Sequence, residues 1–276
     1  MNDQDLRQQI KGYAQRPMEQ RKRWYSSAAE AYDQVRPHYP ISLINRVVDI
    51  AQISSHSSIL EIGCGPATAT VSFAPLGCSI TCLEPNSEFT RLAQQNCQPY
   101  PNITIKNVSF EEWPLSRGCF DYVLAATSFH WIPAEVGYAK AASALNDNGK
   151  LILLWNKELQ PNHRVYQQLA NIYQHHAPEL ARYEDLSTQQ IVLDSLGNLV
   201  LESGHFQEMV SERVTTQVTY SSSEYLALLT TYSPYLQLSA STRQALFKDL
   251  KIFINETLGG KLELAYTSAF HIAQKK

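Results

Sequence analysis

Between Ser58 and Asn156, short apolar runs alternate with stretches that have helical periodicity. Runs such as SILEIG, SITCLE and FDYVLAATS predict buried strands, and SEFTRLAQQNC and PAEVGYAKAASALN predict helices between them. An alternation of this kind is typical of a doubly wound sheet whose strands are mostly parallel. We therefore predict an α/β fold.

Beyond Asn156 this alternation stops. VYQQLANIYQHHAPELARY, SSEYLALLTTYSPYLQL and STRQALFKDLKIFINETLG predict helices, whereas MVSERVTTQVTYS and KLELAYTSAFHIA predict two further strands. The sheet would then have seven strands, with a helical cap inserted late in the chain. The expected organisation is an N-terminal helical arm over 1–40, a core over 41–156, a cap over 157–260 with a core strand near 208–220, and a last core strand over 261–276.

Composition excludes several classes of protein. The formal charge is -3 over 276 residues, which gives no electrostatic footprint for nucleic acid. No leader-like apolar segment and no run near the ~20 apolar residues of a membrane span is visible. We expect a cytoplasmic protein without stable membrane association, either a monomer or a homodimer, that acts on a small molecule rather than on nucleic acid.

Neither the cysteines nor the histidines predict a metal site. Five cysteines stand without C-x-x-C or Cys/His ligand spacing, so a disulfide framework is not indicated either. His175 and His176 are adjacent, and neighbouring residues do not share a helix face.

The segment SSILEIGCGPATAT places a glycine turn directly after the first predicted strand. Gly63 and Gly65 would let a ligand approach backbone N–H groups. Thr68 stands where the dinucleotide fingerprint needs its third glycine, and no lysine followed by serine or threonine completes a phosphate loop. Glu61 precedes the turn, and its negative charge would repel a pyrophosphate but suit a cationic ligand.

Glu84 ends the next predicted strand, about twenty residues after the turn, where a carboxylate accepts hydrogen bonds from both hydroxyls of a ribose. S-Adenosylmethionine combines a ribose with positive charge and has no pyrophosphate. We therefore predict it as the cofactor, and an NAD-dependent oxidoreductase becomes a distant alternative.

With these residues in place, the chain resembles the class I S-adenosylmethionine-dependent methyltransferases, whose sheet is Rossmann-like. LEIGCGPATAT is similar to their first motif, CLEPNSEF to the second and FDYVLAATSFHWI to the fourth-strand motif, and VSFEEWPL resembles the segment that borders the adenine. YDQVRPHYP, SFHW and YLALLTTYS resemble the small-molecule branch that includes trans-aconitate methyltransferases.

The resemblance implies a set of cofactor-binding residues, in which the N-terminal arm folds over the site, Phe89 packs on adenine and Arg36 pairs with the cofactor's carboxylate. The predicted set is Tyr25, Arg36, Glu61, Gly63, Cys64, Gly65, Glu84, Pro85, Asn86, Phe89, Ser109, Phe110, Glu111, Ala126, Thr127 and Ser128.

His130 is the candidate catalytic residue, because ligands collect beyond the carboxyl ends of parallel strands and a histidine there can take a proton from a hydroxyl. The alternative is that His130 only shapes the pocket, since methyl transfer to a carboxylate needs no base. His130, Trp131, Tyr232 and Ser233 are the predicted substrate residues.

The expected reaction is methyl transfer to a small acceptor, with O-methylation of a carboxylate or hydroxyl as the first choice. C-methylation or cyclopropane-type chemistry on a lipid or quinone-like acceptor is an alternative. A module that binds S-adenosylmethionine without catalysis is another.

Overall fold

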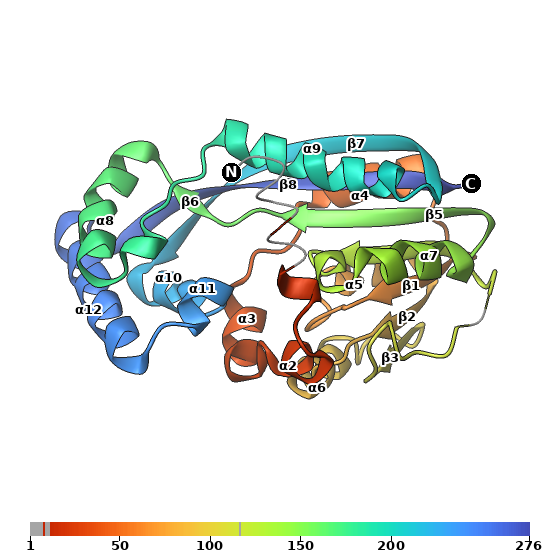
Figure 1. Cartoon of the computed structure of the whole chain (residues 1–276), viewed down its shortest axis with the longest axis horizontal. Helices are drawn as coiled ribbons and strands as arrows, with labels where there is room; N and C mark the ends of the chain where they lie inside the picture. The colour runs from red at the N-terminus through yellow and green to blue at the C-terminus, as the bar shows by residue number, and fades with distance from the viewer. Residues whose placement is uncertain (1–7, 9–11, 116) are drawn as a thin grey trace.

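A computed structural model describes residue 8, residues 12–115 and residues 117–276 of the chain (Figure 1). The first part of the predicted arm, residues 1–7 and 9–11, therefore lies outside the described residues. In the described part, the chain folds around a single mixed sheet of eight strands. Its strands are β1 (Ser58–Ile62), β2 (Ser79–Leu83), β3 (Ile103–Lys106), β4 (Phe120–Ala126), β5 (Leu145–Asn156), β6 (Gln160–Pro161), β7 (Phe206–Ser221) and β8 (Lys261–Lys275).

The sheet has the order β3-β2-β1-β4-β5-β8-β6, and β7 pairs with β8 as well. Neighbouring strands from β3 to β5 are parallel, whereas β8 runs antiparallel to β5, β6 and β7. All seven predicted strands form. The additional strand, β6, consists of Gln160 and Pro161 only, and two residues are too few to give a sequence pattern.

Helices cover both faces of this sheet and continue beyond one end of it (Figure 1). The helices are α2 (Met18–Arg23), α3 (Ala29–Val35), α4 (Ile41–Ala51), α5 (Thr70–Phe73), α6 (Ser87–Asn96), α7 (Ala134–Ala144), α8 (His163–His176), α9 (Leu186–Glu202), α10 (Ser222–Leu229), α11 (Ser233–Leu236) and α12 (Ala240–Thr257).

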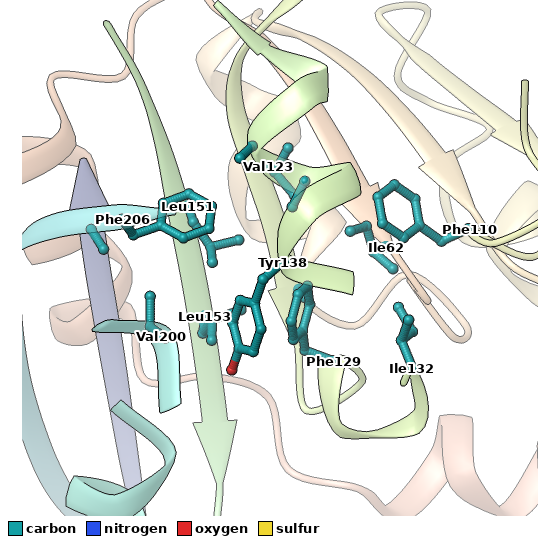
Figure 2. Close-up of a cluster of buried hydrophobic side chains, with 14 of the residues drawn as sticks. Ile62, Phe110, Val123, Phe129, Ile132, Tyr138, Leu151, Leu153, Val200 and Phe206 are labelled. Carbon is teal, nitrogen blue, oxygen red and sulfur yellow. The ribbon is translucent and has the colours of Figure 1, made fainter. Parts of the chain in front are cut away.

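One face of the sheet packs against α7 and α9 (Figure 2). Leu151 and Leu153 of β5 face this layer, where Tyr138 of α7 stacks at a tilt on Phe129 with ring centroids 4.9 Å apart. The other face packs against α4, whose Ile44 and Val47 are buried. Burial on both faces explains why these strands read as continuous apolar runs.

The position of helix α9 differs from the expected division into core and cap. It lies within residues 157–260, which were predicted as a cap, yet its Val192, Leu193, Leu196 and Val200 pack on the sheet as part of the core. The cap consists instead of α8, α10, α11 and α12, which gather at one end of the molecule (Figure 1). Its own apolar cluster includes Leu169, Leu228, Leu246, Leu250 and Ile254.

No helix in the described part of the chain is both long enough and apolar enough to cross a membrane.

Candidate functional site

The glycine turn after β1 is held tightly against the end of β4. Gly63 has a φ of +64°, a conformation that L side chains rarely adopt. A Cβ atom at Gly63 would lie 2.8 Å from Cβ of Ser128, the second residue beyond β4. The backbone N–H of Gly63 donates to the carbonyl of Leu83 at 2.8 Å. A glycine is therefore required at this position by both conformation and space.

Glu84 fixes the end of β2 beside this turn. Its Oε2 accepts the backbone N–H of Gly65 and its Oε1 accepts that of Asn86, each at 2.8 Å. Burial raises the pKa of Glu84 to about 7, although these two N–H groups favour the carboxylate. The carboxyl group is thus oriented by the backbone and can change its charge near neutral pH.

A first chamber opens over this turn, bounded by the N-terminal arm and by the ends of β1, β2, β4 and β5. It contains fifteen of the sixteen predicted cofactor residues. These are Tyr25, Arg36, Gly63, Cys64, Gly65, Glu84, Pro85, Asn86, Phe89, Ser109, Phe110, Glu111, Ala126, Thr127 and Ser128.

Glu61 is the exception, because it does not line the chamber, and its contact with the cofactor stays a prediction. Its side chain is fully buried under the glycine turn and does not line the chamber. Oε2 accepts a hydrogen bond from the Thr70 hydroxyl at 2.6 Å, and burial raises the pKa of Glu61 to about 7. The side chain contacts Thr70 and Cys82 rather than the chamber because strand residues alternate between the faces of the sheet.

Arg36 lies between the arm and the cap. Its Nε and one terminal nitrogen donate to the hydroxyl and the carbonyl of Thr231, at 2.7 and 2.6 Å. Its guanidinium carbon lies 4.1 Å from the ring centroid of Tyr232 and 4.9 Å from that of Tyr32. Among the described residues, no carboxylate forms an ion pair with Arg36, and Glu158 acts on its guanidinium from a greater distance.

Helix α2 is fastened over the first chamber. Arg21 donates to Glu111 at 2.7 Å and to the carbonyl of Trp131 at 2.6 Å. Asn86 donates to the carbonyl of Lys22 at 2.8 Å and to the Ser26 hydroxyl at 2.9 Å. Because these partners come from different loops of the core, the arm closes the chamber and joins its walls.

A second chamber adjoins the first. Its walls are the residues Tyr13, Tyr25, Tyr32, Arg36, Thr127, His130, Trp131, Trp155, Asn156, Lys157, Glu158, Val192, Leu196, Tyr232, Ser233 and Pro234. All four predicted substrate residues are among them. Seven of these residues also line the first chamber and form what we call the shared wall: Tyr25, Tyr32, Arg36, Thr127, Trp131, Asn156 and Lys157.

His130 belongs to a short 3-10 helix, Phe129–Trp131, that follows β4. Its ring packs edge-on to Tyr13 and lies 5.8 Å from the Trp155 ring. Nδ1 is buried without a hydrogen-bond partner in the described part of the structure. Burial, together with the positive charge of Lys157, lowers the pKa of His130 to about 4, so the imidazole is neutral at physiological pH.

The two predicted cap residues enter the second chamber differently. The Tyr232 hydroxyl accepts the Leu159 N–H at 3.1 Å, so the ring rather than the hydroxyl is presented. The Ser233 hydroxyl bonds Trp24 Nε1 at 3.0 Å and the Tyr25 hydroxyl at 2.9 Å. Ser233 therefore joins the cap to the arm, and Tyr232 joins the cap to the segment that follows β5, while both line the chamber.

Sequence reasoning missed several lining residues. Asn156 and Lys157 directly follow β5, where the strand-end rule that found Glu84 could have found them. Trp155, Val192 and Leu196 gave no such signal because they are core residues of β5 and α9. In the described residues, no group of His, Cys, Asp or Glu side chains is arranged to hold a metal ion.

Comparison with known proteins identifies the core. Residues 59–149, which span β1 to the start of β5, match the family model of a methyltransferase domain. This part of the chain is thus similar to a methyltransferase domain. S-Adenosylmethionine is the cofactor that the sequence predicts for such a domain.

Two curated relatives are also named as methyltransferases. The chain is 31% identical over 126 residues to an uncharacterized methyltransferase-like protein of Schizosaccharomyces pombe, covering 45% of this chain and 48% of that one. It is 25% identical over 146 residues to a Saccharomyces cerevisiae protein named as an S-adenosylmethionine-dependent methyltransferase, covering 51% and 49%. The chain thus spans about half the length of the curated relatives it matches.

Solved structures confirm the Rossmann-like methyltransferase fold. A protein of Anaeromyxobacter dehalogenans, named for a type II methyltransferase, has a TM-score of 0.62 at 16% identity and covers 87% of this chain and 97% of its own. The phosphoethanolamine N-methyltransferase 2 of Haemonchus contortus, in complex with S-adenosyl-L-methionine, has a TM-score of 0.53 at 12% identity, covering 93% and 58%.

The first chamber has the features that this cofactor needs. Gly63 and Gly65 leave room above the turn, and Glu84 offers an oriented carboxylate to hydroxyl groups. Phe89 and Phe110 provide apolar surface for a base, and Arg36 supplies a positive charge for a carboxylate. The residues present therefore fit S-adenosylmethionine.

Proposed function

We propose that this chain is an S-adenosylmethionine-dependent methyltransferase that methylates an oxygen of a small acceptor, a carboxylate or a hydroxyl. The observation that carries the proposal is the shared wall between the two chambers. A cofactor in the first chamber and an acceptor in the second would meet at this wall. The small-molecule acceptor is supported by the arm and the cap, which both contribute walls to the second chamber.

Within the first chamber, each predicted residue has a role that its position supports. Glu84 would accept the ribose hydroxyls, and the turn at Gly63–Gly65 would receive the nucleoside at close range. Phe89 would pack on the adenine, with the Ser109–Glu111 segment along its edge. Arg36 would pair with the carboxylate of the cofactor's methionine part, a charge-assisted contact.

When bound, the cofactor supplies a methyl group that its sulfonium has already activated. The work of the chain is to orient the acceptor and to exclude water. The fastening of Arg21 to Glu111 and to the Trp131 carbonyl would keep the arm closed during transfer. A neutral His130 would hold or shape the acceptor, since a base works best when its pKa is near the operating pH.

The finer resemblance to trans-aconitate methyltransferases remains a prediction. Arg36 and Lys157 are compatible with an acidic acceptor, but the second chamber is lined mainly by aromatic and aliphatic side chains. We therefore favour an acceptor with fewer charges than a tricarboxylate.

The test is a screen with methyl-labelled S-adenosylmethionine against mono- and tricarboxylic acids, phenols and lipids, with products identified by mass. We expect a labelled ester or ether together with S-adenosylhomocysteine, and no product with Glu84→Gln at limiting cofactor. Labelled product on carbon or on nitrogen would overturn the oxygen acceptor. Tight S-adenosylhomocysteine binding without turnover of any acceptor would favour a binding module.

A further inference from the structure

The second chamber changes character along its length. At the shared wall it presents polar and cationic groups, namely Arg36, Thr127, Asn156 and Lys157. The other three residues of that wall, Tyr25, Tyr32 and Trp131, are aromatic, and the residues outside it include His130, Glu158 and Ser233 besides Trp155, Val192 and Leu196. A ligand that fills the chamber can therefore meet cationic groups at the shared wall and the apolar side chains of Trp155, Val192 and Leu196 beyond it.

The apolar end is part of the protein core. Val192 and Leu196 stand one helical turn apart on α9, with relative exposures of 4% and 8%. They pack in the same cluster as Leu153 and Trp155. Because these side chains are held by the core on every other side, the depth of the chamber is fixed rather than adaptable.

The charged end favours an anion. Arg36 is bonded to the neutral Thr231 and has no ion-pair partner in the described part of the chain. Lys157 pairs with Glu184 at 3.0 Å, which leaves its charge largely balanced. Glu158 is the acidic residue that lines the chamber; it follows Lys157 directly, and its charge acts on Arg36. With Arg36 engaged by the cofactor's carboxylate, the bound sulfonium is the positive charge that an acceptor carboxylate would meet at the shared wall.

We propose that the acceptor is a monocarboxylic acid with an extended apolar body, which lies with its carboxylate at the shared wall and its body against Trp155, Val192 and Leu196. This inference rests on the proposed function. In the reaction, a carboxylate oxygen forms the new O–C bond while the S–C bond breaks and its electron pair stays on sulfur. An anion and a cation become a neutral methyl ester and S-adenosylhomocysteine, and no proton is transferred.

A homologous series tests the assignment. Straight-chain acids from butyrate to laurate are assayed for kcat/KM, with tricarboxylates as the polar comparison. Each buried methylene should raise kcat/KM about fourfold until the chain reaches α9. Longer acids should then lose activity. A profile without dependence on chain length, or a preference for tricarboxylates, would overturn the proposal.

Substitutions on α9 locate the apolar end. Leu196→Phe should move the optimum to shorter acids and Leu196→Ala to longer ones. Ile191→Phe is the matched control, because Ile191 is 51% exposed on the same helix and lines neither chamber. S-Adenosylhomocysteine affinity should be the same in all of these variants, which also shows that each is folded.

Two negative results distinguish the proposed function from the position of the acceptor's apolar body. If no acceptor is methylated and S-adenosylhomocysteine does not bind, the proposed function itself is wrong. If acids are methylated but Leu196→Phe and Leu196→Ala share the wild-type length profile, only the position of the apolar body is wrong.

Discussion

The Glu84 carboxylate accepts the backbone N–H of Gly65 at 2.8 Å. This hydrogen bond joins the end of β2 to the turn that follows β1. The same carboxylate also accepts the Asn86 N–H, so one acidic side chain organises both loops that border the first chamber. A substitution of Glu84 would therefore alter the backbone at Gly65 and Asn86 as well as the contact with the cofactor.

Glu84→Gln should weaken S-adenosylhomocysteine binding by about 10- to 100-fold, because a hydrogen bond to a charged group contributes roughly 1.5–3 kcal/mol. Isothermal titration calorimetry measures the change. Glu88→Gln is the control, since Glu88 is exposed on α6 and pairs with Arg91. An unchanged dissociation constant in Glu84→Gln would remove the residue from the ribose role.

Cofactor binding should depend on pH through Glu84. Its pKa is raised to about 7 in the free protein, and hydroxyl donors favour the carboxylate, so binding should lower that pKa and release a proton. The dissociation constant for S-adenosylhomocysteine should be constant above pH ~8 and rise as pH falls through about 7. Calorimetry in buffers of different ionisation enthalpy counts the proton.

Glu61 provides the control for this pH dependence, since burial raises its pKa to about 7 as well. Glu61→Gln should keep the pH dependence because Glu61 does not line the chamber, whereas Glu84→Gln should abolish it. If Glu61→Gln abolished the pH dependence and Glu84→Gln kept it, Glu61 would be the group that titrates.

Gly63→Ala should destabilise the protein and abolish cofactor binding. A left-handed φ costs an L residue about 1–2 kcal/mol, and the new methyl would also meet Ser128 at 2.8 Å. Gly118→Ala separates the two effects, because Gly118 has a φ of +65° with no atom near its Cβ position. Denaturant unfolding should show a larger loss for Gly63→Ala than for Gly118→Ala; equal losses would mean that the contact with Ser128 costs nothing.

Arg21→Ala should speed the release of S-adenosylhomocysteine. The substitution removes the hydrogen bonds to Glu111 and to the Trp131 carbonyl, so the dissociation rate should rise by about 10-fold on the usual value of a charged hydrogen bond. Arg23→Ala, at an exposed position of the same helix, should leave the rate unchanged. Stopped-flow competition measures both. Equal rates in the two variants would show that α2 does not gate the chamber.

His130→Gln should lower kcat by less than about 10-fold, because a neutral His130 does not act as a general base. Removal of a general base typically lowers the rate by about 10²–10⁴-fold. The neutral imidazole follows from a pKa of about 4. At saturating cofactor, kcat of the wild type with a carboxylate acceptor should accordingly be flat between pH 6 and 9. A sigmoidal dependence of kcat on pH near neutrality that disappears in His130→Gln would show instead that His130 is a general base.

The parallel core was accessible from sequence because its strands are buried on both faces and its helices have clear periodicity. Helix α9 was not, for reasons visible in its packing. Gln189 and Ser195 are buried on the core face and interrupt its apolar pattern. Gly197 lies mid-helix because a Cβ there would be 2.8 Å from Nδ1 of His271.

The candidate site could likewise be predicted from the sequence only in part. Residues that follow strands, such as Glu84 and Ser128, could be placed from their position in the motifs. Glu61 could not, because its neighbours Thr70 and Cys82 come from elements whose packing the sequence does not reveal. The apolar end of the second chamber depends on α9 and was therefore hidden with it.

The pairing of β8 has a consequence for how the protein is made. Lys150 of β5 pairs with Gln274 of β8, so the sheet cannot close until α8 to α12 have been synthesised. Contacts this distant in sequence slow folding. Residues 59–149 alone would leave β4 without its partner β5 and would expose a strand edge that invites aggregation. Residues 59–149, which match the methyltransferase model, are thus too short to be a folding unit. Expression trials should include all strands of the sheet.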